Sequence, residues 1–152
     1  MSETSTTASF QPGPYAVPSV TLPVFQRFQL ERWAAQAYPL VACGLLYGHF
    51  EGDSVSVVQT RLAAEAATGE CRDVLDPSDH RAGEQEAREL GLEIVGTWRS
   101  RPNEAAVPTP DDRAHAWAGW SHVLVAIDLH AEREVRSWRF DGGRFVEEEV
   151  AS

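Results

Sequence analysis

The sequence predicts a single α/β domain in which helices flank a mixed β-sheet. Helical and strand periodicities alternate along most of the chain, as they do in domains of this class. The chain has 152 residues, of which 43% are hydrophobic, enough to build the core of one domain. We expect a flexible tail over residues 1–18, which are rich in Ser, Thr, Pro and Gly, and one domain over residues 19–152. The tail lacks the basic start and apolar run of a signal peptide.

The expected order of elements is α-β-β-α-β-α-β-β-β. Helices follow from apolar residues at spacings of three and four, and strands from short β-branched and aromatic runs between turn residues. The helices are expected at 24–38, 77–90 and 110–119, and the strands at 43–50, 54–62, 92–98, 122–129, 135–140 and 144–150, with a short strand end at 74–75.

Several helix boundaries carry recognisable signals. Pro39 ends the first helix, because its ring clashes with a continuing helix. Asp76 is placed to cap the second helix, and Gly91 is placed to end it. Thr109 and Asp112 have the spacing of a capping box around the proline that starts the third helix. The loop from 102 to 108, with a proline at each end, is expected to be exposed.

Charge and cysteine content exclude several function classes. The chain has 13 Lys and Arg against 23 Asp and Glu, for a formal net charge of -10. Nucleic acids and anionic membrane surfaces would repel such a chain, and no apolar stretch approaches the roughly 20 residues of a membrane span. The two cysteines, Cys43 and Cys71, imply no disulfide framework, so we expect a cytoplasmic protein.

Two segments and two single residues together form a recognisable motif. Residues 39–48 read PLVACGLLYG, and residues 96–102 read GTWRSRP. Seven residues after Arg101 comes Thr109, and Asp112 follows three positions later. In this order and spacing the chain resembles the bacterial JAMM type of the Mov34/MPN/PAD metallopeptidases, over roughly residues 22–140. The resemblance implies an MPN-type, cytidine-deaminase-like domain of three layers, with helices flanking a curved mixed sheet.

The family residues that perform catalysis are mostly replaced. In the family, two histidines and an aspartate hold Zn²⁺, a glutamate takes the proton from the bound water, and a serine stabilises the oxyanion. The matching positions here are Val41 for the glutamate, Arg99 and Arg101 for the histidines, Thr109 for the serine and Asp112 for the aspartate. Valine cannot accept a proton, and arginine has no lone pair to offer a metal. We therefore expect no zinc cofactor and no catalytic residues, which is the pattern of a pseudoenzyme.

The residues at these positions have two interpretations each. Thr109 and Asp112 are explained by helix capping alone. Arg99 and Arg101 lie two positions apart on a strand and so point to one side, where they would pair with Asp112 in place of the metal or bind an anionic group such as a carboxylate. The candidate binding set therefore comprises Arg99, Ser100, Arg101, Thr109 and Asp112.

Other reactive residues favour ordinary structural roles. Cys43 lies in an apolar run, which is typical of a core cysteine, although an arginine nearby would activate it as a nucleophile. His115 lies one helical turn after Asp112, so a displaced metal site with a cysteine is the alternative metal hypothesis. The acidic runs 84–89 and 147–149 are typical of solvated faces.

The resemblance implies function through a protein partner. Active relatives cleave ubiquitin-like or sulfur-carrier proteins after a terminal Gly-Gly, and inactive ones pair with a second MPN-type subunit or serve as scaffolds. We therefore expect protein binding, either of such a tail along an unpaired strand edge or of a second subunit in a dimer. The alternatives are an active zinc metallopeptidase or isopeptidase with substituted ligands, and an anion or small-molecule binder that uses Arg99 and Arg101.

Overall fold

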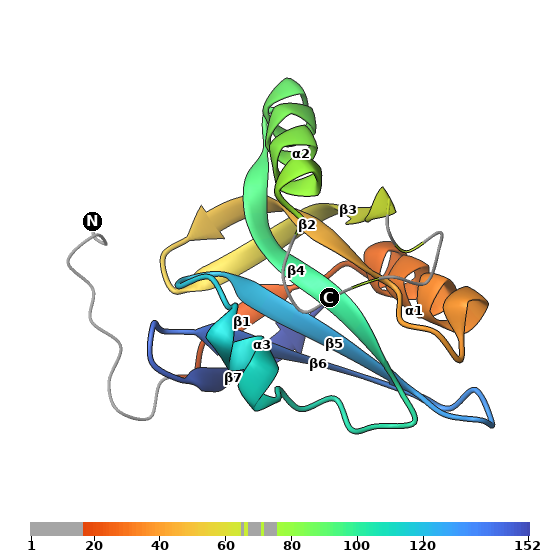
Figure 1. Ribbon diagram of the computed structural model, residues 1–152. Coiled ribbons are helices and arrows are strands. Elements are labelled where there is room, and N and C mark those ends of the chain that lie inside the picture. The colour runs from red at the N-terminus through yellow and green to blue at the C-terminus, as the bar shows by residue number, and fades with distance from the viewer. Residues whose placement is uncertain (1–16, 65, 67–70, 72–75) are drawn as a thin grey trace.

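The computed structural model describes residues 17–64, 66, 71 and 76–152, and shows a mixed α/β domain built on a closed barrel (Figure 1). The strands follow one another around the barrel in the order β1-β3-β2-β4-β5-β6-β7, and β1 pairs with both β3 and β7. The strands are β1 (Ser19–Thr21), β2 (Cys43–Glu51), β3 (Ser54–Leu62), β4 (Glu93–Pro102), β5 (Ser121–Ile127), β6 (Arg133–Phe140) and β7 (Phe145–Ala151). The helices are α1 (Val24–Ala37), α2 (Pro77–Glu89) and α3 (Pro110–Ala114).

The sheet is mixed, as predicted, but it closes on itself, which the sequence did not predict. Three pairs are parallel (β1 with β3, β1 with β7, and β4 with β5), and the others are antiparallel. Strand β1 was missed because three residues are too few to show an alternating pattern. Residues 1–16 and 74–75, where a tail and a strand end were expected, lie outside the described residues. Pro18, at the end of the expected tail, accepts a hydrogen bond from the Glu149 N–H.

Closure also removes the unpaired strand edge that was expected beside the family motif. Each strand of the described chain pairs on both sides over at least part of its length. At the motif itself, Cys43 of β2 lies opposite Arg99 of β4. The pairing continues past the end of the ladder, because the Ser100 N–H donates to the Ala42 carbonyl at 2.8 Å.

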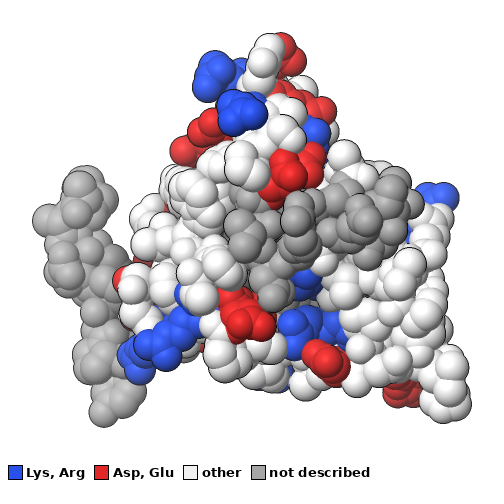
Figure 2. All heavy atoms as spheres, viewed as in Figure 1, with Lys and Arg blue, Asp and Glu red and all other residues white. Residues whose placement is uncertain are grey.

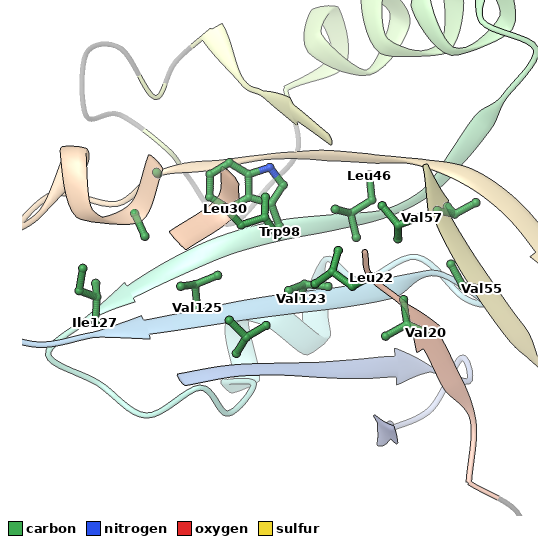
Figure 3. Packing of buried hydrophobic residues seen from close by; sticks show 14 residues of the cluster. Val20, Leu22, Leu30, Leu46, Val55, Val57, Trp98, Val123, Val125 and Ile127 are labelled. Carbon is green, nitrogen blue, oxygen red and sulfur yellow. The ribbon is translucent and has the colours of Figure 1, made fainter. Parts of the chain in front are cut away.

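The main core fills the inside of the barrel and extends beneath α1. Trp98 of β4 is almost fully buried and stacks on Trp33 of α1, with ring centroids 5.5 Å apart. Its indole N–H donates to the Arg61 carbonyl at 2.9 Å, so the buried polar group is satisfied. Figure 3 shows aliphatic side chains from several strands, among them Leu46 and Val123, pointing into the same core as this indole.

Helix α2 packs on the outside of β2 and β4 and stands clear of the rest of the barrel (Figure 1). Gly83 allows the close approach, since a Cβ there would lie 2.4 Å from Leu45 Cδ1. The Tyr47 hydroxyl donates to Glu86 at 2.7 Å, and Arg61 pairs with the same carboxylate at 3.2 Å. Burial raises the pKa of Tyr47 to about 12.

The capping signals are confirmed. Asp76 accepts hydrogen bonds from the backbone N–H groups of Ser78 and Asp79, and Gly91 has a φ of +73° after α2. Several local expectations were wrong. Strand β4 runs on to Pro102 rather than ending at residue 98, and β5 ends at Ile127 rather than at residue 129. Helix α3 ends at Ala114 rather than near residue 119. The loop after β4 is not wholly exposed, because Ala106 is buried and its carbonyl accepts the indole N–H of a tryptophan in β6.

The acidic run 147–149 is not a uniformly solvated face. The side chain of Glu148 is fully buried and pairs with Arg139. Its carboxylate also accepts hydrogen bonds from the hydroxyl groups of Ser121 and Ser137. Because β7 alternates its side chains, the middle glutamate points inward while its two neighbours point out.

Candidate functional site

A pocket opens where the start of β2, the end of β4 and the segment around α3 meet. Its walls come from five parts of the chain that are distant in sequence. The lining residues are Cys43, Gly44, Ala63, Thr97, Trp98, Arg99, Pro108, Asp112, His115, Ala116, Trp117, His122, Leu124 and Phe145. In Figure 2 basic atoms lie in a recess between acidic atoms, on the face that presents β4 and α3. Of the predicted family positions, Arg99 and Asp112 line this pocket.

Strand β4 positions the two arginines as the sequence predicted. Arg99 and Arg101 are both half-buried, while Trp98 and Ser100, which alternate with them along the strand, are buried on the other side. Arg99 lines the pocket. Arg101 pairs with Glu104 at 2.8 Å and with Asp112 at 3.6 Å, so it lies between two carboxylates.

Asp112 is held by the start of α3. Its Oδ2 accepts the Thr109 N–H at 2.8 Å, and its own N–H donates to Thr109 Oγ1 at 3.2 Å. The capping box is thus complete, and the same carboxylate oxygen faces Arg101. Asp112 reaches the pocket wall, whereas Thr109 does not appear among the described residues that line it. Capping accounts for the contacts of Thr109.

Two further predicted site residues lie away from the pocket lining of the described chain. Val41 is half-buried just before β2, and the lining begins at Cys43. Ser100 is buried, and its hydroxyl accepts the Ala42 N–H at 2.8 Å. That bond holds the start of β2 against β4. It gives Ser100 a structural contact rather than a position in the pocket.

The residues present do not fit a catalytic zinc ion. A zinc site needs three neutral or anionic donors with an open fourth position, and two of the three family positions carry guanidinium groups. His115 and Asp112 both line the pocket, which is the geometry required by the displaced-site hypothesis. Within the described ranges, however, no three His, Cys, Asp or Glu side chains are grouped to hold a metal ion.

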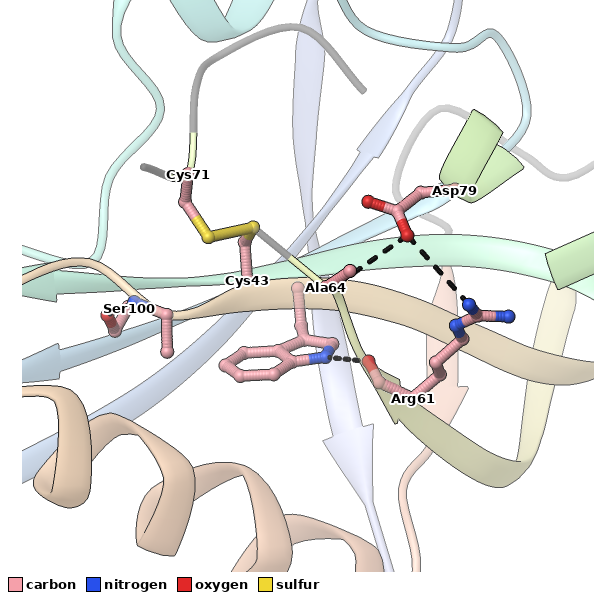
Figure 4. The surroundings of a disulfide bond; sticks show 8 residues. Cys43, Arg61, Ala64, Cys71, Asp79 and Ser100 are labelled. Carbon is pink, nitrogen blue, oxygen red and sulfur yellow. Dashed lines mark hydrogen bonds and ion pairs between the residues drawn. A yellow bond between two sulfur atoms is a disulfide. The ribbon is translucent and has the colours of Figure 1, made fainter. Parts of the chain in front are cut away.

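Cys43 forms a disulfide with Cys71, which corrects both readings of that cysteine (Figure 4). It is neither an unpaired core thiol nor a nucleophile, because its sulfur is bonded. The two Cα atoms lie 6.1 Å apart, although the residues are 28 positions apart in sequence. Sequence spacing alone does not bring two such residues together, and the expectation of no disulfide was wrong. The bond fixes Cys71 to the wall of the pocket.

His122 is a pocket residue that the sequence did not identify. Its ring contacts Phe145 edge-on, with centroids 5.3 Å apart. Both ring nitrogens are buried and, in the part of the chain that the structure describes, neither has a hydrogen-bond partner. Burial lowers the pKa of His122 to about 4, against smaller opposing effects of the nearby backbone carbonyls of Trp138 and Trp120 and of the Asp112 carboxylate. The imidazole is therefore neutral near pH 7.

Trp117, which lines the pocket and is 44% exposed, belongs to an aromatic cluster. It stacks on Trp120 with centroids 4.7 Å apart. His80 of α2 meets both rings edge-on, so this cluster ties α2 to the segment before β5. The pair of tryptophans three positions apart was the available sequence signal. It was missed because aromatic pairs at that spacing are usual in ordinary cores.

No helix in the described part of the chain is long and apolar enough to cross a membrane.

Comparison with known proteins places the chain in a family. A solution structure of a protein from Desulfitobacterium hafniense is similar, with a TM-score of 0.71, 24% identity, and coverage of 86% of this chain and 90% of that one. A solution structure from Salinibacter ruber has a TM-score of 0.66 and 27% identity over 86% and 89% of the two chains. A crystal structure of a JAB1/MPN domain protein from Archaeoglobus fulgidus has a TM-score of 0.50 and 18% identity over 88% and 96%. No curated protein matches this chain in sequence.

The family itself is shown by sequence. The model of the prokaryotic homologs of the JAB domain matches residues 26–141, which is most of the chain. The matched region contains β2, β4 and α3, the elements that build the pocket. The fold and the sequence thus agree, and this chain belongs to the prokaryotic homologs of the JAB domain.

Proposed function

We propose that this domain is catalytically degenerate and acts by binding the C-terminal tail of a protein partner. The observation that supports the proposal is a pocket at the family's catalytic position in which Arg99 occupies a metal-ligand position. A guanidinium group cannot ligate zinc, but it binds a carboxylate through paired hydrogen bonds. Arginine at this position therefore suits the binding of an anion rather than of a metal ion.

The partner that the family implies is a ubiquitin-like or sulfur-carrier protein ending in Gly-Gly. Its terminal carboxylate would meet Arg99, and Arg101 would keep Asp112 compensated from the side. Among the described residues, β2 and β4 pair with each other here as far as Ala42 and Ser100, so recognition would depend on the chain end rather than on main-chain pairing along the tail. A second MPN-type subunit remains the other protein partner that the family implies.

A small-molecule or anion binder is the second candidate function. Most of the lining is apolar or aromatic, which is typical of pockets that bind small ligands. An active zinc peptidase is disfavoured by the donor set, since the general base is replaced by Val41 and two ligands by arginines.

Two measurements test the proposal. A Gly-Gly-ended carrier protein is titrated into the wild type, into Arg99→Ala/Arg101→Ala, and into Arg81→Ala/Arg88→Ala, which removes the same charge from the exposed surface of α2. We expect binding by the wild type and the α2 variant and a loss of about tenfold or more in the pocket variant. Equal binding by all three proteins, or by none, contradicts tail capture at this pocket. In parallel, elemental analysis showing about one zinc per chain, together with cleavage of an isopeptide substrate, would contradict degeneracy.

A further inference from the structure

The pocket has more apolar surface than a terminal Gly-Gly could cover. Beyond Arg99 its wall includes Trp117, Leu124 and Phe145. Leu124 is buried and Trp117 is 44% exposed, so this apolar lining reaches from the interior to solvent. A glycine has no side chain to cover such a wall, so a Gly-Gly end would leave it exposed to water.

The charged residues of the pocket favour a ligand with one anionic group beside that wall. The Asp112 carboxylate is engaged by the α3 cap and by Arg101, which offsets its charge. The Arg99 guanidinium carries five N–H donors in a planar fork, a geometry that matches a carboxylate whatever else it contacts. His122 adds no second cation near neutral pH, because its imidazole is uncharged. Among the described lining residues, the Arg99 guanidinium thus lies next to an aromatic and aliphatic surface.

We infer that the pocket recognises a protein chain end whose last residue has an apolar side chain of leucine or phenylalanine size. The carboxylate of that residue meets Arg99, and its side chain covers Trp117, Leu124 and Phe145. The inference rests on the proposed function, because the same arginine takes the carboxylate in both. It differs in the identity of the last residue, and therefore in the class of partner.

Each half of the ligand has an expected effect on affinity. Burying a side chain of this size strengthens binding by roughly tenfold to a hundredfold relative to glycine. Replacing the terminal carboxylate by an amide removes the charge that the arginine fork binds, so it weakens binding by about tenfold. The two effects come from different walls of the pocket and can be separated by substitution.

The experiment uses labelled peptides of one sequence that differ only at the end: Gly-Gly, Gly-Leu, Gly-Phe, and Gly-Phe amide. Fluorescence anisotropy is measured with the wild type, Arg99→Gln, Trp117→Ala, and Phe25→Ala, a matched aromatic truncation on the exposed surface of α1. We expect Gly-Leu and Gly-Phe to bind at least about tenfold tighter than Gly-Gly. Arg99→Gln should weaken every carboxylate peptide, Trp117→Ala only those with an apolar end, and Phe25→Ala none.

The outcomes separate this inference from the proposed function. If Gly-Gly binds as tightly as Gly-Phe, or if Trp117→Ala weakens all peptides alike, the apolar subsite is wrong while tail capture stands. If Gly-Phe binds and Gly-Gly does not, the subsite stands and the Gly-Gly carriers are excluded as partners. Binding of no peptide by the folded wild type overturns both. Circular dichroism spectra of the variants show whether each has kept its fold.

Discussion

At Asp112 a single carboxylate closes a helix cap and compensates a cation. Its Oδ2 accepts the Thr109 N–H and lies 3.6 Å from Arg101 Nη1. Arg101 has a closer partner in Glu104, at 2.8 Å, so the pair with Asp112 is only part of its environment. Glu104 is largely exposed, and water weakens its contribution more than that of the half-buried aspartate. The Asp112 carboxylate is thus a structural contact at the start of α3.

His122 makes the stability of the domain depend on pH. Its pKa is about 4 in the folded protein and about 6.5 in an unfolded chain, so below pH 6.5 the unfolded state binds more protons. The free energy of unfolding should therefore fall as the pH drops from about 6.5 to about 4, by up to about 3 kcal/mol. His122→Phe should remove this part of the pH dependence, as measured by urea denaturation between pH 4 and pH 7.

His115→Phe serves as the control, since that ring is exposed on the rim of the same pocket. A His122→Phe protein whose stability changes with pH as steeply as the wild type would contradict the prediction. Should the substitution prevent folding, NMR titration of the His122 ring in the wild type measures the same property. A titration midpoint near pH 6.5 would also contradict the prediction.

Residue patterns predicted those parts of the site that depend on local geometry. The two-residue period of a strand placed Arg99 and Arg101 on one side, and the capping signature fixed Thr109 to Asp112. The contacts that could not be predicted cross between distant segments. The sulfur atoms of Cys43 and Cys71, and the rings of His122 and Phe145, meet only once the barrel has formed.

At the scale of elements, β2 and β4 are the frame of the pocket, and glycine lets their neighbours approach closely. Gly44 lies beside the β3 backbone and beneath the Trp98 indole. A Cβ at this position would lie 1.8 Å from the Arg61 carbonyl oxygen and 2.6 Å from Trp98 Nε1. Both atoms belong to one hydrogen bond, the donation from Trp98 to Arg61, so neither can move without breaking it.

Gly44→Ala should therefore destabilise the domain severely, by about 4 kcal/mol or more, because backbone atoms must shift within a packed core. The comparison is Gly143→Ala in the turn before β7, where a Cβ would make only an ordinary contact at 3.7 Å. Thermal and urea unfolding of both variants measure the difference. Similar midpoints for the two proteins would show that the strands can separate without cost.

The boundaries of α1, α2, β2, β3 and β7 were predictable from sequence to within one residue, and the way in which the elements meet was not. Strand β3 was predicted to the residue, and α2 to within one residue at its end, because turns, caps and a terminal glycine mark them. Strand β1 was invisible, since its three residues show no period. Without β1 the sequence describes a sheet with two edges, and with it the sheet has none. Closure is therefore a property of the whole molecule that no single segment reveals.

For the whole molecule, a buried ion pair lies where the barrel closes. Arg139 of β6 pairs with Glu148 of β7 and also donates to the Ser19 carbonyl of β1 at 3.1 Å. The glutamate is further satisfied by hydroxyl groups from β5 and β6, so one cluster connects four strands. Removing one member of a buried pair leaves the other without compensation.

Glu148→Ala should lower the free energy of unfolding by about 3–5 kcal/mol, because the Arg139 cation stays buried. Glu149→Ala, one position along and exposed, should leave it nearly unchanged. Urea denaturation at neutral pH measures both. The double change Arg139→Met/Glu148→Leu should recover much of the loss. A Glu148→Ala protein as stable as Glu149→Ala would show that the cluster does not hold the barrel closed.

The bond between Cys43 and Cys71 changes the chain from a line into a ring with two arms. The ring encloses β2 and β3 completely, while α2, β4, α3 and β5 to β7 belong to the longer arm. One wall of the pocket is thus part of the ring and the opposite wall part of the arm. When the protein denatures with the bond intact, the ring keeps the two strands within reach of each other, and by loop-closure entropy alone this is worth about 3–4 kcal/mol. An oxidised unfolded molecule is then a ring that carries two tails, and it is more compact than its reduced counterpart. Refolding brings both tails back against a ring whose two strands have stayed close together.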